Sequence, residues 1–257
     1  MQKIRYLLVL PILFSVYYIK AQSVERYRYV YTTVLLDSTY SRNENPEMKK
    51  YVEHLRKDLS KEMDKIIGES AETLTSYAPA SPLSNLLTDM ILDFGKAFMK
   101  EHHGVSADLS LINFGGIRNI MPKGDITVGT VFQILPFENS LVILSLKGSE
   151  LKKVFSRFTD KNNQPYSNAR MVYRNGKPAR ITVDGGEIHD ERIYRMVTVD
   201  FIQTGGDHIL ENIEWEDVVY TDRLIRDVII EEIQKMSAQG KRVNAVTDDR
   251  VVIEIQP

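Results

Sequence analysis

Segments with a helical apolar repeat alternate with strand-like segments along most of this chain, and this alternation most constrains its fold. Between Asn45 and Gly68 apolar residues recur every three or four positions, with asparagine and proline at the start and glycine at the end. Further helices are predicted over 81–104, 127–135, 149–158 and 222–236, and strands over 24–37, 108–113, 140–148, 169–174, 179–184, 192–202 and 249–255. No repeat or low-complexity linker interrupts the pattern, so we predict an α+β fold (mixed α/β) in a single domain.

The N-terminal 21 residues have the pattern of an export signal, so we predict that the mature domain covers 22–257. Lys3 and Arg5 precede an apolar stretch that ends at Ile19, and the small residue Ala21 follows. The alternative is an uncleaved anchor, which we disfavour because a membrane span needs about 20 apolar residues. The expected location is the periplasm or the medium, with no permanent membrane span.

Charge and cysteine content exclude several classes of function. The chain has 257 residues, of which 33 are basic and 35 acidic, and its formal net charge is −2. This balance gives no electrostatic reason to expect a nucleic-acid polymer or an anionic membrane as partner, although small anions need only one or two local charges. Because the chain has no cysteine, it forms no disulfide, thiolate metal site or cysteine nucleophile.

The residue patterns of self-contained catalysts are not found. A dinuclear phosphoesterase needs a dense set of aspartate, histidine and asparagine ligands at several strand ends, and the five histidines here are scattered. Neither a Gly-x-Ser-x-Gly elbow nor a Walker loop occurs. We therefore predict no catalytic residue and no metal site in this chain, and we interpret it as a binding domain.

Three predicted loops carry side chains suited to a small ligand. The first runs from Asn113 to Arg118 after a buried strand and contains two adjacent glycines, which let backbone N–H groups approach a ligand closely. The second carries Phe137 and Asn139, and the third carries Phe201 and then Gly205-Gly206-Asp207. Together they provide the candidate binding residues Asn113, Gly115, Gly116, Arg118, Phe137, Phe201 and Asp207.

The chemistry of these residue types points to a flat ring with a sugar. Two loop phenylalanines can stack on a base, which is worth roughly 1–3 kcal/mol. Asn113 offers a donor and an acceptor to a ring edge, Asp207 accepts from sugar hydroxyls, and Arg118 suits a phosphate or a ribose. Each residue also has a plainer explanation, because loop phenylalanines often cap a core, a glycine pair often forms a turn, and a lone arginine is often a surface charge. The combination favours the binding interpretation.

Several separated motifs resemble the C-terminal, nucleotide-binding domain of the 5′-nucleotidase family. The resemblance extends from about Pro79 to Asp207 and follows the family's order and spacing. The motifs are SPLSNLLTDMI, NFGGIR, GDITVGTVFQILPFENSLVILSLKGSELKKVF and FIQTGGD. The resemblance implies that Phe137 and Phe201 stack on the nucleobase, and that Asn113 contacts the base. It further implies that Arg118 faces the ribose and phosphate, and that Asp207 holds the ribose hydroxyls.

Two departures from the family pattern shape the functional hypothesis. The resemblance implies an N-terminal metallophosphoesterase domain with two metals, for which this chain has no room. The stretch before the predicted helix at Ser84 also lacks the arginines common in the family, which would weaken nucleotide binding more than nucleoside binding.

These departures lead to a leading hypothesis and two alternatives. In the leading one, the chain is the nucleoside- or nucleotide-binding half of a split 5′-nucleotidase that serves nucleotide hydrolysis and salvage. It would itself hold no cofactor, and the divalent metals would lie on a separate metallophosphoesterase chain. The alternatives are a non-catalytic exported nucleoside-binding protein and an interaction module with a degenerate pocket.

Overall fold

A computed structural model describes Thr33 and residues 45–254 of the chain. The export segment predicted over 1–21 lies outside the described residues, as does the strand predicted over 24–37 apart from Thr33. The chain divides after Lys50 into two units, and the second contains the sheets and the predicted site. Within the described residues, no helix combines the length and the apolar character that a membrane crossing requires.

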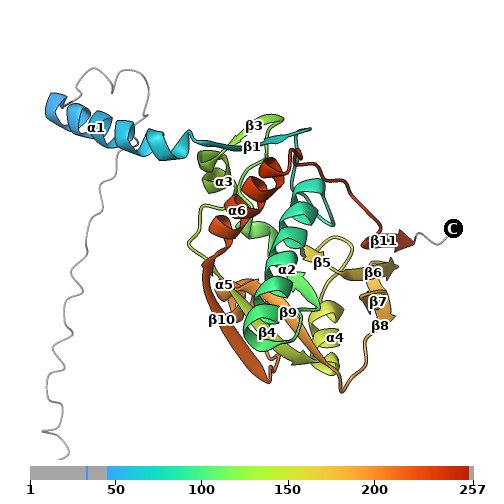
Figure 1. Ribbon diagram of the computed structural model, residues 1–257. Coiled ribbons are helices and arrows are strands. Elements are labelled where there is room, and N and C mark those ends of the chain that lie inside the picture. Colours follow the sequence, from blue (N-terminus) through green and yellow to red (C-terminus); the bar gives the residue numbers. More distant parts are fainter. Residues whose placement is uncertain (1–32, 34–44, 255–257) are drawn as a thin grey trace, which may run out of the picture. The chain divides into compact units, whose positions relative to one another are not determined.

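The second unit is built on a five-stranded sheet (Figure 1). The strand order is β10–β4–β9–β2–β5, and neighbours are antiparallel except for the parallel pair β2 and β9. The strands are β2 (Leu109–Leu111), β4 (Ser140–Lys147), β5 (Tyr166–Ser167), β9 (Ile193–Val199) and β10 (Asp217–Leu224). The strands β4 and β9 are buried along most of their length, as expected for central strands covered on both faces.

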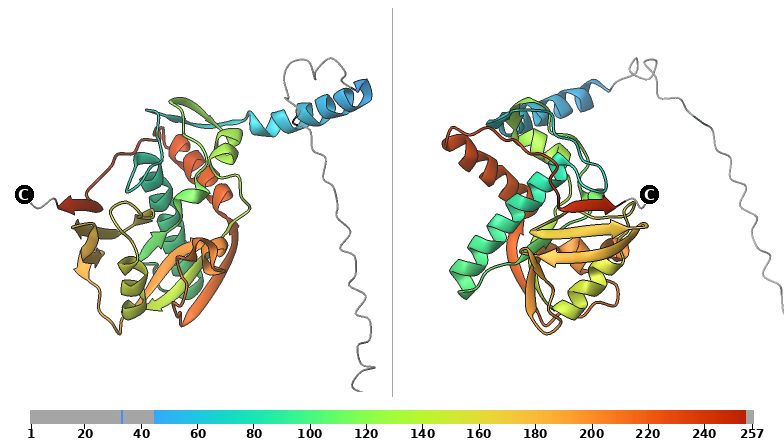
Figure 2. Two further views of the ribbon diagram at one scale, coloured as in Figure 1. Left: turned by 180° about the vertical axis from the view of Figure 1, so that it is seen from behind. Right: turned by 90° about the vertical axis from the view of Figure 1, so that its right-hand side faces the viewer.

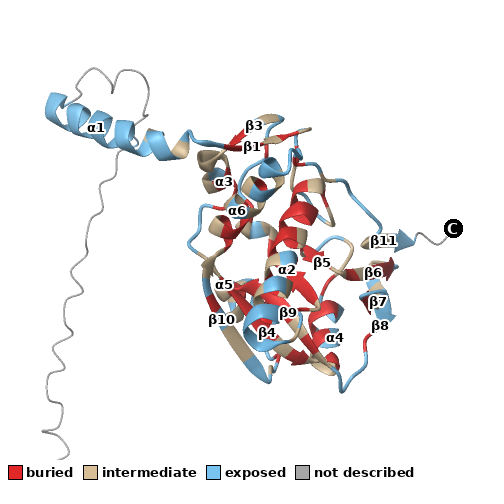
Figure 3. Ribbon diagram, viewed as in Figure 1, coloured by how far each residue is buried: buried red, intermediate tan, exposed pale blue. Residues whose placement is uncertain are grey.

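Helices cover both faces of this sheet. On one side lie α2 (Pro82–His103) and α6 (Ile225–Ala238), and on the other lies α4 (Gly148–Ser156), as the right-hand view of Figure 2 shows. A Cβ atom at Gly95 of α2 would lie 2.3 Å from the Val197 side chain of β9, so this close approach requires glycine. Buried residues concentrate on the sheet and on the helix faces that cover it (Figure 3).

Two smaller sheets complete the unit. The strands β11 (Val251–Glu254), β6 (Ala169–Arg174), β7 (Lys177–Val183) and β8 (Gly186–Glu187) form one in that order, with only β11 and β6 parallel. The other pairs β1 (Ile66–Ser70) with β3 (Gly124–Thr127), which leads directly into α3 (Val128–Ile134). The Asn175-Gly176 turn between β6 and β7 has φ angles of 53° and 77°, the left-handed pair that this dipeptide favours. The predicted mixed α/β fold is confirmed.

The first predicted helix is shorter than its sequence pattern indicates. The helix α1 (Pro46–Met63) begins as predicted, because the Asn45 side-chain oxygen accepts from two N–H groups of the first turn at 3.0 and 3.2 Å. Ile66 and Gly68, predicted at its end, belong instead to β1. A Cβ atom at Gly68 would lie 2.7 Å from an α6 side chain, so this glycine permits strand packing and does not terminate the helix.

The strand predicted over 192–202 is also wrong at its end. The strand β9 stops at Val199 and turns into the short helix α5 (Asp200–Gln203), so Phe201 lies on a helix and not at a strand end. Ile202 is fully buried on α5 and continues the apolar pattern of the strand, which conceals the change in the sequence.

The helix predicted over 222–236 begins only at Ile225. The residues before it form β10, an edge strand that the sequence pattern did not predict. Of the eight residues in β10 only Thr221 is buried, so this strand lacks a clear alternation of buried and exposed positions. The other predicted helices and strands match observed elements within a few residues.

Candidate nucleoside-binding site

Three loops meet at one end of the inner strands of the five-stranded sheet. Because β2 and β9 are parallel neighbours, their C-terminal ends emerge side by side, with Asn113 after β2 and Phe201 on α5 after β9. The strand β4 runs antiparallel to β9, with Leu141 opposite Val199. The loop that precedes β4 and carries Phe137 therefore lies at the same end of the sheet as the C-terminal end of β9. The connectivity of the sheet therefore brings together segments that are distant in the sequence.

The seven predicted binding residues line a single cavity of about 270 Å³, which we call the aromatic cavity. Its lining consists of Asn113, Gly115, Gly116, Arg118, Phe137, Phe201 and Asp207, together with Asn139. Asn139 lies in the second candidate loop but was not among the predicted binding residues, and its position two residues after Phe137 was the available signal. Ligand binding by these residues stays a prediction.

The two phenylalanines are unusually accessible for aromatic side chains. Phe137 is 47% exposed and Phe201 is 41% exposed. The two rings line the same cavity, and within residues 45–254 neither stacks on the other or on a further aromatic ring. A Cβ atom at Gly206 would lie within 2.5 Å of three Phe201 ring carbons, so the ring lies directly on that glycine. Leaving two large apolar surfaces in water is unfavourable unless a ligand covers them.

The glycine loop packs against two polar side chains of the cavity. Gly115 and Gly116 belong to the single turn η3 (Phe114–Gly116). A Cβ atom at Gly115 would lie 3.2 Å from Nδ2 of Asn113 and 3.6 Å from Oδ2 of Asp207, and one at Gly116 would lie 3.0 Å from Oδ1 of Asn113. The glycine pair therefore permits close approach to the Asn113 carboxamide, in addition to forming a turn.

Asn113 and Asp207 are joined directly. The Asn113 Nδ2 group donates to Oδ2 of Asp207 at 2.6 Å, and Asn113 is only 5% exposed. Asp207 lies in the turn η4 (Gly206–His208) with a φ of 53°, a left-handed backbone that aspartate tolerates better than most residues. Asn113 thus orients the Asp207 carboxylate at the cavity wall, a contact that the sequence did not predict. A carboxylate held in this way still has free acceptor positions for hydroxyl groups.

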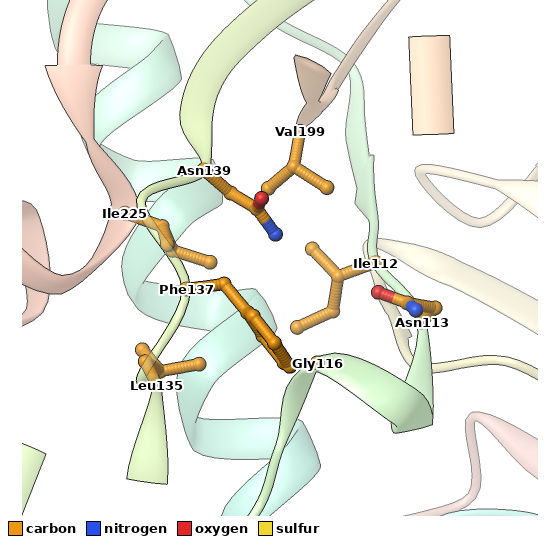
Figure 4. A pocket seen from close by; sticks show the side chains of 8 residues that line it. All are labelled: Ile112, Asn113, Gly116, Leu135, Phe137, Asn139, Val199 and Ile225. Atoms are coloured by element: carbon orange, nitrogen blue, oxygen red, sulfur yellow. The ribbon is translucent and has the colours of Figure 1, made fainter. Parts of the chain in front are cut away.

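A small, mostly aliphatic hollow of about 10 Å³ adjoins the aromatic cavity (Figure 4). It shares Asn113, Gly116, Phe137 and Asn139 with that cavity. Ile112, Leu135, Val199 and Ile225 complete this hollow. In Figure 4 the Asn139 amide group points into the hollow between the aliphatic side chains. The backbone of Asn139 is fixed because its carbonyl oxygen accepts from the Ile225 N–H at 3.0 Å.

Arg118 lies at the rim with its charge available. Its side chain donates to the Gly115 carbonyl oxygen at 3.3 Å, and no carboxylate among the described residues forms an ion pair with it. The backbone of Arg118 is held firmly, because its N–H donates to the Ile134 carbonyl oxygen at the end of α3 at 2.8 Å. An exposed guanidinium on a fixed backbone can recruit an anionic group.

Within the described residues, no three histidine, aspartate or glutamate side chains gather in a way that would hold a metal ion. His54 is exposed on α1, and His208 lies on the surface beside Asp207. The site therefore offers groups that bind and orient a ligand, namely aromatic faces, one carboxylate, two carboxamides and one guanidinium.

Residues 63–212 match the family described as 5′-nucleotidase, C-terminal domain, so the chain belongs to this family. Among curated proteins, the chain is 25% identical over 232 residues to the trifunctional nucleotide phosphoesterase protein YfkN of Bacillus subtilis, covering 81% of this chain and 15% of that protein. It is 32% identical over 106 residues to protein UshA of Escherichia coli, covering 39% of this chain and 19% of that protein.

A solved structure, that of a 5′-nucleotidase precursor from Thermus thermophilus, is similar to this one with a TM-score of 0.66 and 26% identity. The match covers 81% of this chain and 43% of that one. The structure of the NAD nucleotidase of Haemophilus influenzae shares the fold, with a TM-score of 0.61 and 17% identity over 84% of this chain and 42% of that one. The chain thus spans less than half the length of each of these relatives.

Proposed function

We propose that this chain binds the nucleoside part of a nucleotide in the aromatic cavity and forms the binding half of a split 5′-nucleotidase outside the cytoplasm. One observation carries the proposal: two half-exposed phenylalanines line a cavity that also holds a carboxylate and an arginine, and that arginine forms no ion pair with any residue that the structure describes. Membership in the 5′-nucleotidase C-terminal domain family supports the substrate class, as does similarity to a named nucleotide phosphoesterase.

Each group has a role that follows from its chemistry. A base stacks between the rings of Phe137 and Phe201, and the Asp207 carboxylate accepts from the ribose hydroxyls. Arg118 faces the ribose or the 5′-phosphate. The chain supplies binding and orientation, and a separate metallophosphoesterase chain supplies divalent metals, which activate water and stabilise charge on the phosphoryl group.

The binding role is tested by calorimetric titration of the purified chain with adenosine and AMP. Replacing one stacking ring, Phe201→Ala, is expected to weaken adenosine binding about 5- to 150-fold, which corresponds to the roughly 1–3 kcal/mol of base stacking. The matched control is Tyr220→Ala, which removes another exposed aromatic ring outside the cavity. The proposal fails if the wild-type chain binds neither ligand, or if both variants lose affinity equally.

The catalytic division of labour needs a separate test. The chain alone, with Mg²⁺, Mn²⁺ or Zn²⁺, is expected to leave AMP intact, while addition of a separate metallophosphoesterase chain is expected to produce adenosine and phosphate. The Phe201→Ala variant should support much less of this activity. Hydrolysis of AMP at an enzyme-like rate by the chain alone, free of contaminating phosphatase, would contradict the split arrangement.

A second candidate function is a stand-alone nucleoside-binding protein without catalysis. It is favoured by the fact that residues of this chain are sufficient to form a cavity of about 270 Å³ with two aromatic rings, a carboxylate and two carboxamides. Tight adenosine binding, without stimulation of AMP hydrolysis by any metallophosphoesterase chain, would support this alternative.

The extracytoplasmic location rests on the N-terminal sequence pattern. Cell fractionation of the full chain, followed by N-terminal sequencing, is expected to find it outside the cytoplasm with Gln22 as the first residue. Recovery of the uncleaved chain in the cytoplasm would contradict this location.

A further inference from the structure

The backbone that carries Asp207 is strained and needs to be held in place. Asp207 and the next residue, His208, have φ angles of 53° and 54°, two consecutive left-handed residues without glycine. Such a conformation costs about 1–2 kcal/mol per residue and persists only where neighbouring groups impose it. The hydrogen bond from Asn113 fixes the end of the Asp207 side chain but does not hold the chain that follows.

Arg157 provides that second restraint. Its Nη1 atom donates to the carbonyl oxygens of His208 and Ile209 at 3.4 and 3.0 Å, and its Nη2 atom donates to the carbonyl oxygen of Glu211. One guanidinium therefore bridges three backbone carbonyls of the segment that follows Asp207. The planar fork of arginine suits this role, because its donors point in fixed directions.

The backbone of Arg157 is anchored to the core, although the residue itself is exposed. It caps the C-terminus of α4, where its N–H donates to the Val154 carbonyl oxygen at 3.3 Å. Leu151, Val154 and Phe155 of this helix are fully buried. No carboxylate among the described residues forms an ion pair with the Arg157 guanidinium, so the backbone carbonyls are its hydrogen-bond partners.

We propose that Arg157 is a positioning residue that holds the Asp207 carboxylate in the orientation needed to bind ribose hydroxyls. This inference rests on the proposed function, since it assumes that Asp207 contacts the sugar. Arg157 does not line the aromatic cavity, so it acts through the loop and not on the ligand. Its loss should therefore affect recognition of the ribose hydroxyls and leave recognition of the base unchanged.

The test compares adenosine, 2′,3′-dideoxyadenosine and free adenine by calorimetric titration. In the wild-type chain, adenosine is expected to bind about 10- to 150-fold more tightly than the dideoxy compound, the range for hydrogen bonds to a charged group. Arg157→Gln is expected to reduce this ratio of affinities about tenfold or to unity, and Asp207→Asn is expected to do the same. Affinity for adenine should stay within about twofold of wild type, which also shows that the variant is folded.

Two further variants sharpen the result. Arg157→Lys keeps the charge but cannot bridge three carbonyls, so its preference for adenosine over 2′,3′-dideoxyadenosine should lie between those of wild type and Arg157→Gln. Arg180→Gln removes an exposed arginine that pairs with Glu187 on the four-stranded sheet, and it should leave the ratio unchanged. A wild-type ratio in Arg157→Gln would overturn the inference and leave the proposed function intact.

A second measurement does not depend on the ligand. Hydrogen exchange of the amides in 206–212 is expected to be at least tenfold faster in Arg157→Gln than in Arg180→Gln. Unchanged protection of this loop would overturn the positioning role. Absence of any preference for adenosine over the dideoxy compound in the wild-type chain would instead remove the proposed role of Asp207, and the inference with it.

Discussion

Two cavities of nearly equal size lie on this molecule, and only one of them resembles a ligand site. The aromatic cavity measures about 270 Å³ and the second, which we call the Arg250 cavity, about 260 Å³. The Arg250 cavity is lined by Asn168, Ala169, Arg170, Thr182, Gly185, Asp248, Asp249 and Arg250. Volume therefore does not distinguish the two cavities. They differ in whether the side chains that line them are already hydrogen-bonded within the protein.

The two arginines show this difference most clearly. Arg250 is fixed by five hydrogen bonds, to both carboxylate oxygens of Asp248, to Asp89, to the Tyr166 carbonyl and to Thr88, at 2.7 to 3.3 Å. Within the described part of the chain, the Arg118 side chain makes one hydrogen bond, of 3.3 Å, to a backbone carbonyl. A saturated guanidinium holds the fold together, whereas an unsaturated one at a rim is available to a ligand.

The largest expected effect is on stability. Arg250→Ala should lower the free energy of unfolding by about 2–3 kcal/mol, less than the 3–5 kcal/mol of a fully buried pair because the two carboxylates are partly exposed. Denaturant unfolding measures this value. Adenosine affinity should not change, and an equal loss of affinity would show that the Arg250 cavity is coupled to the site.

The second prediction concerns the contact between Gly206 and Phe201. A Cβ atom at position 206 would overlap the phenylalanine ring, so Gly206→Ala should displace the ring and weaken adenosine binding about 5- to 150-fold. Gly206 has no left-handed φ, so overlap with the ring is the direct effect of an added Cβ at that position. Gly205 is the control for disturbance of the turn, since its φ is 104° and an added Cβ meets no atom within 4 Å beyond its chain neighbours. If Gly205→Ala lowers affinity as much, disturbance of the turn is sufficient to explain the loss.

A smaller effect is expected at the rim of the aromatic cavity. Arg118→Gln should weaken AMP binding by up to about fivefold, the range for an exposed ion pair, and leave adenosine binding unchanged. Stability should stay within about 0.5 kcal/mol of wild type, since the side chain makes one hydrogen bond to the residues that the structure describes. Equal losses for AMP and adenosine would assign Arg118 to the ribose instead of the phosphate.

The smallest expected effect is a pH dependence of the Arg250 cavity. Burial raises the pKa of Asp248, but the hydrogen bonds donated by Arg250 lower it by a larger amount. The pKa of Asp248 in the folded protein therefore lies below its usual value of 3.8. The stabilisation is therefore present above about pH 4 and is lost as the pH falls through the lower pKa of the folded state. The stability difference between wild type and Arg250→Ala should shrink between pH 5 and pH 3. A difference that grows on acidification would contradict this assignment.

The sequence predicted which residues line the aromatic cavity better than it predicted the contacts that hold them in place. The loops at Asn113, Phe137 and Phe201 carry their signal in neighbouring residues, and the structure brings all seven predicted residues to one cavity. Arg157 gave no such signal, because its partners are backbone carbonyls about 50 residues away. Arg250 likewise contacts residues more than 80 positions away, and only the folded chain reveals such contacts.

Errors in the secondary structure have similar physical causes. Buried Ile202 continued the strand pattern into α5, and the half-exposed edge strand β10 lacked the alternation that identifies a strand. Tertiary packing decided both boundaries. Local turn chemistry was more reliable, as the cap at Asn45 and the Asn175-Gly176 turn show.

Much of the aromatic cavity is anchored by main-chain bonds. The N–H of Arg118 is bonded to the Ile134 carbonyl, and the carbonyl of Asn139 is bonded to the N–H of Ile225. Every residue except proline offers these same N–H and C=O groups, so most side-chain replacements at these four positions leave the bonds available. The side chains at these positions can therefore diverge over evolutionary time while the backbone segments around the cavity keep their spacing. Ligand preference can then change without a change in the backbone structure of the site.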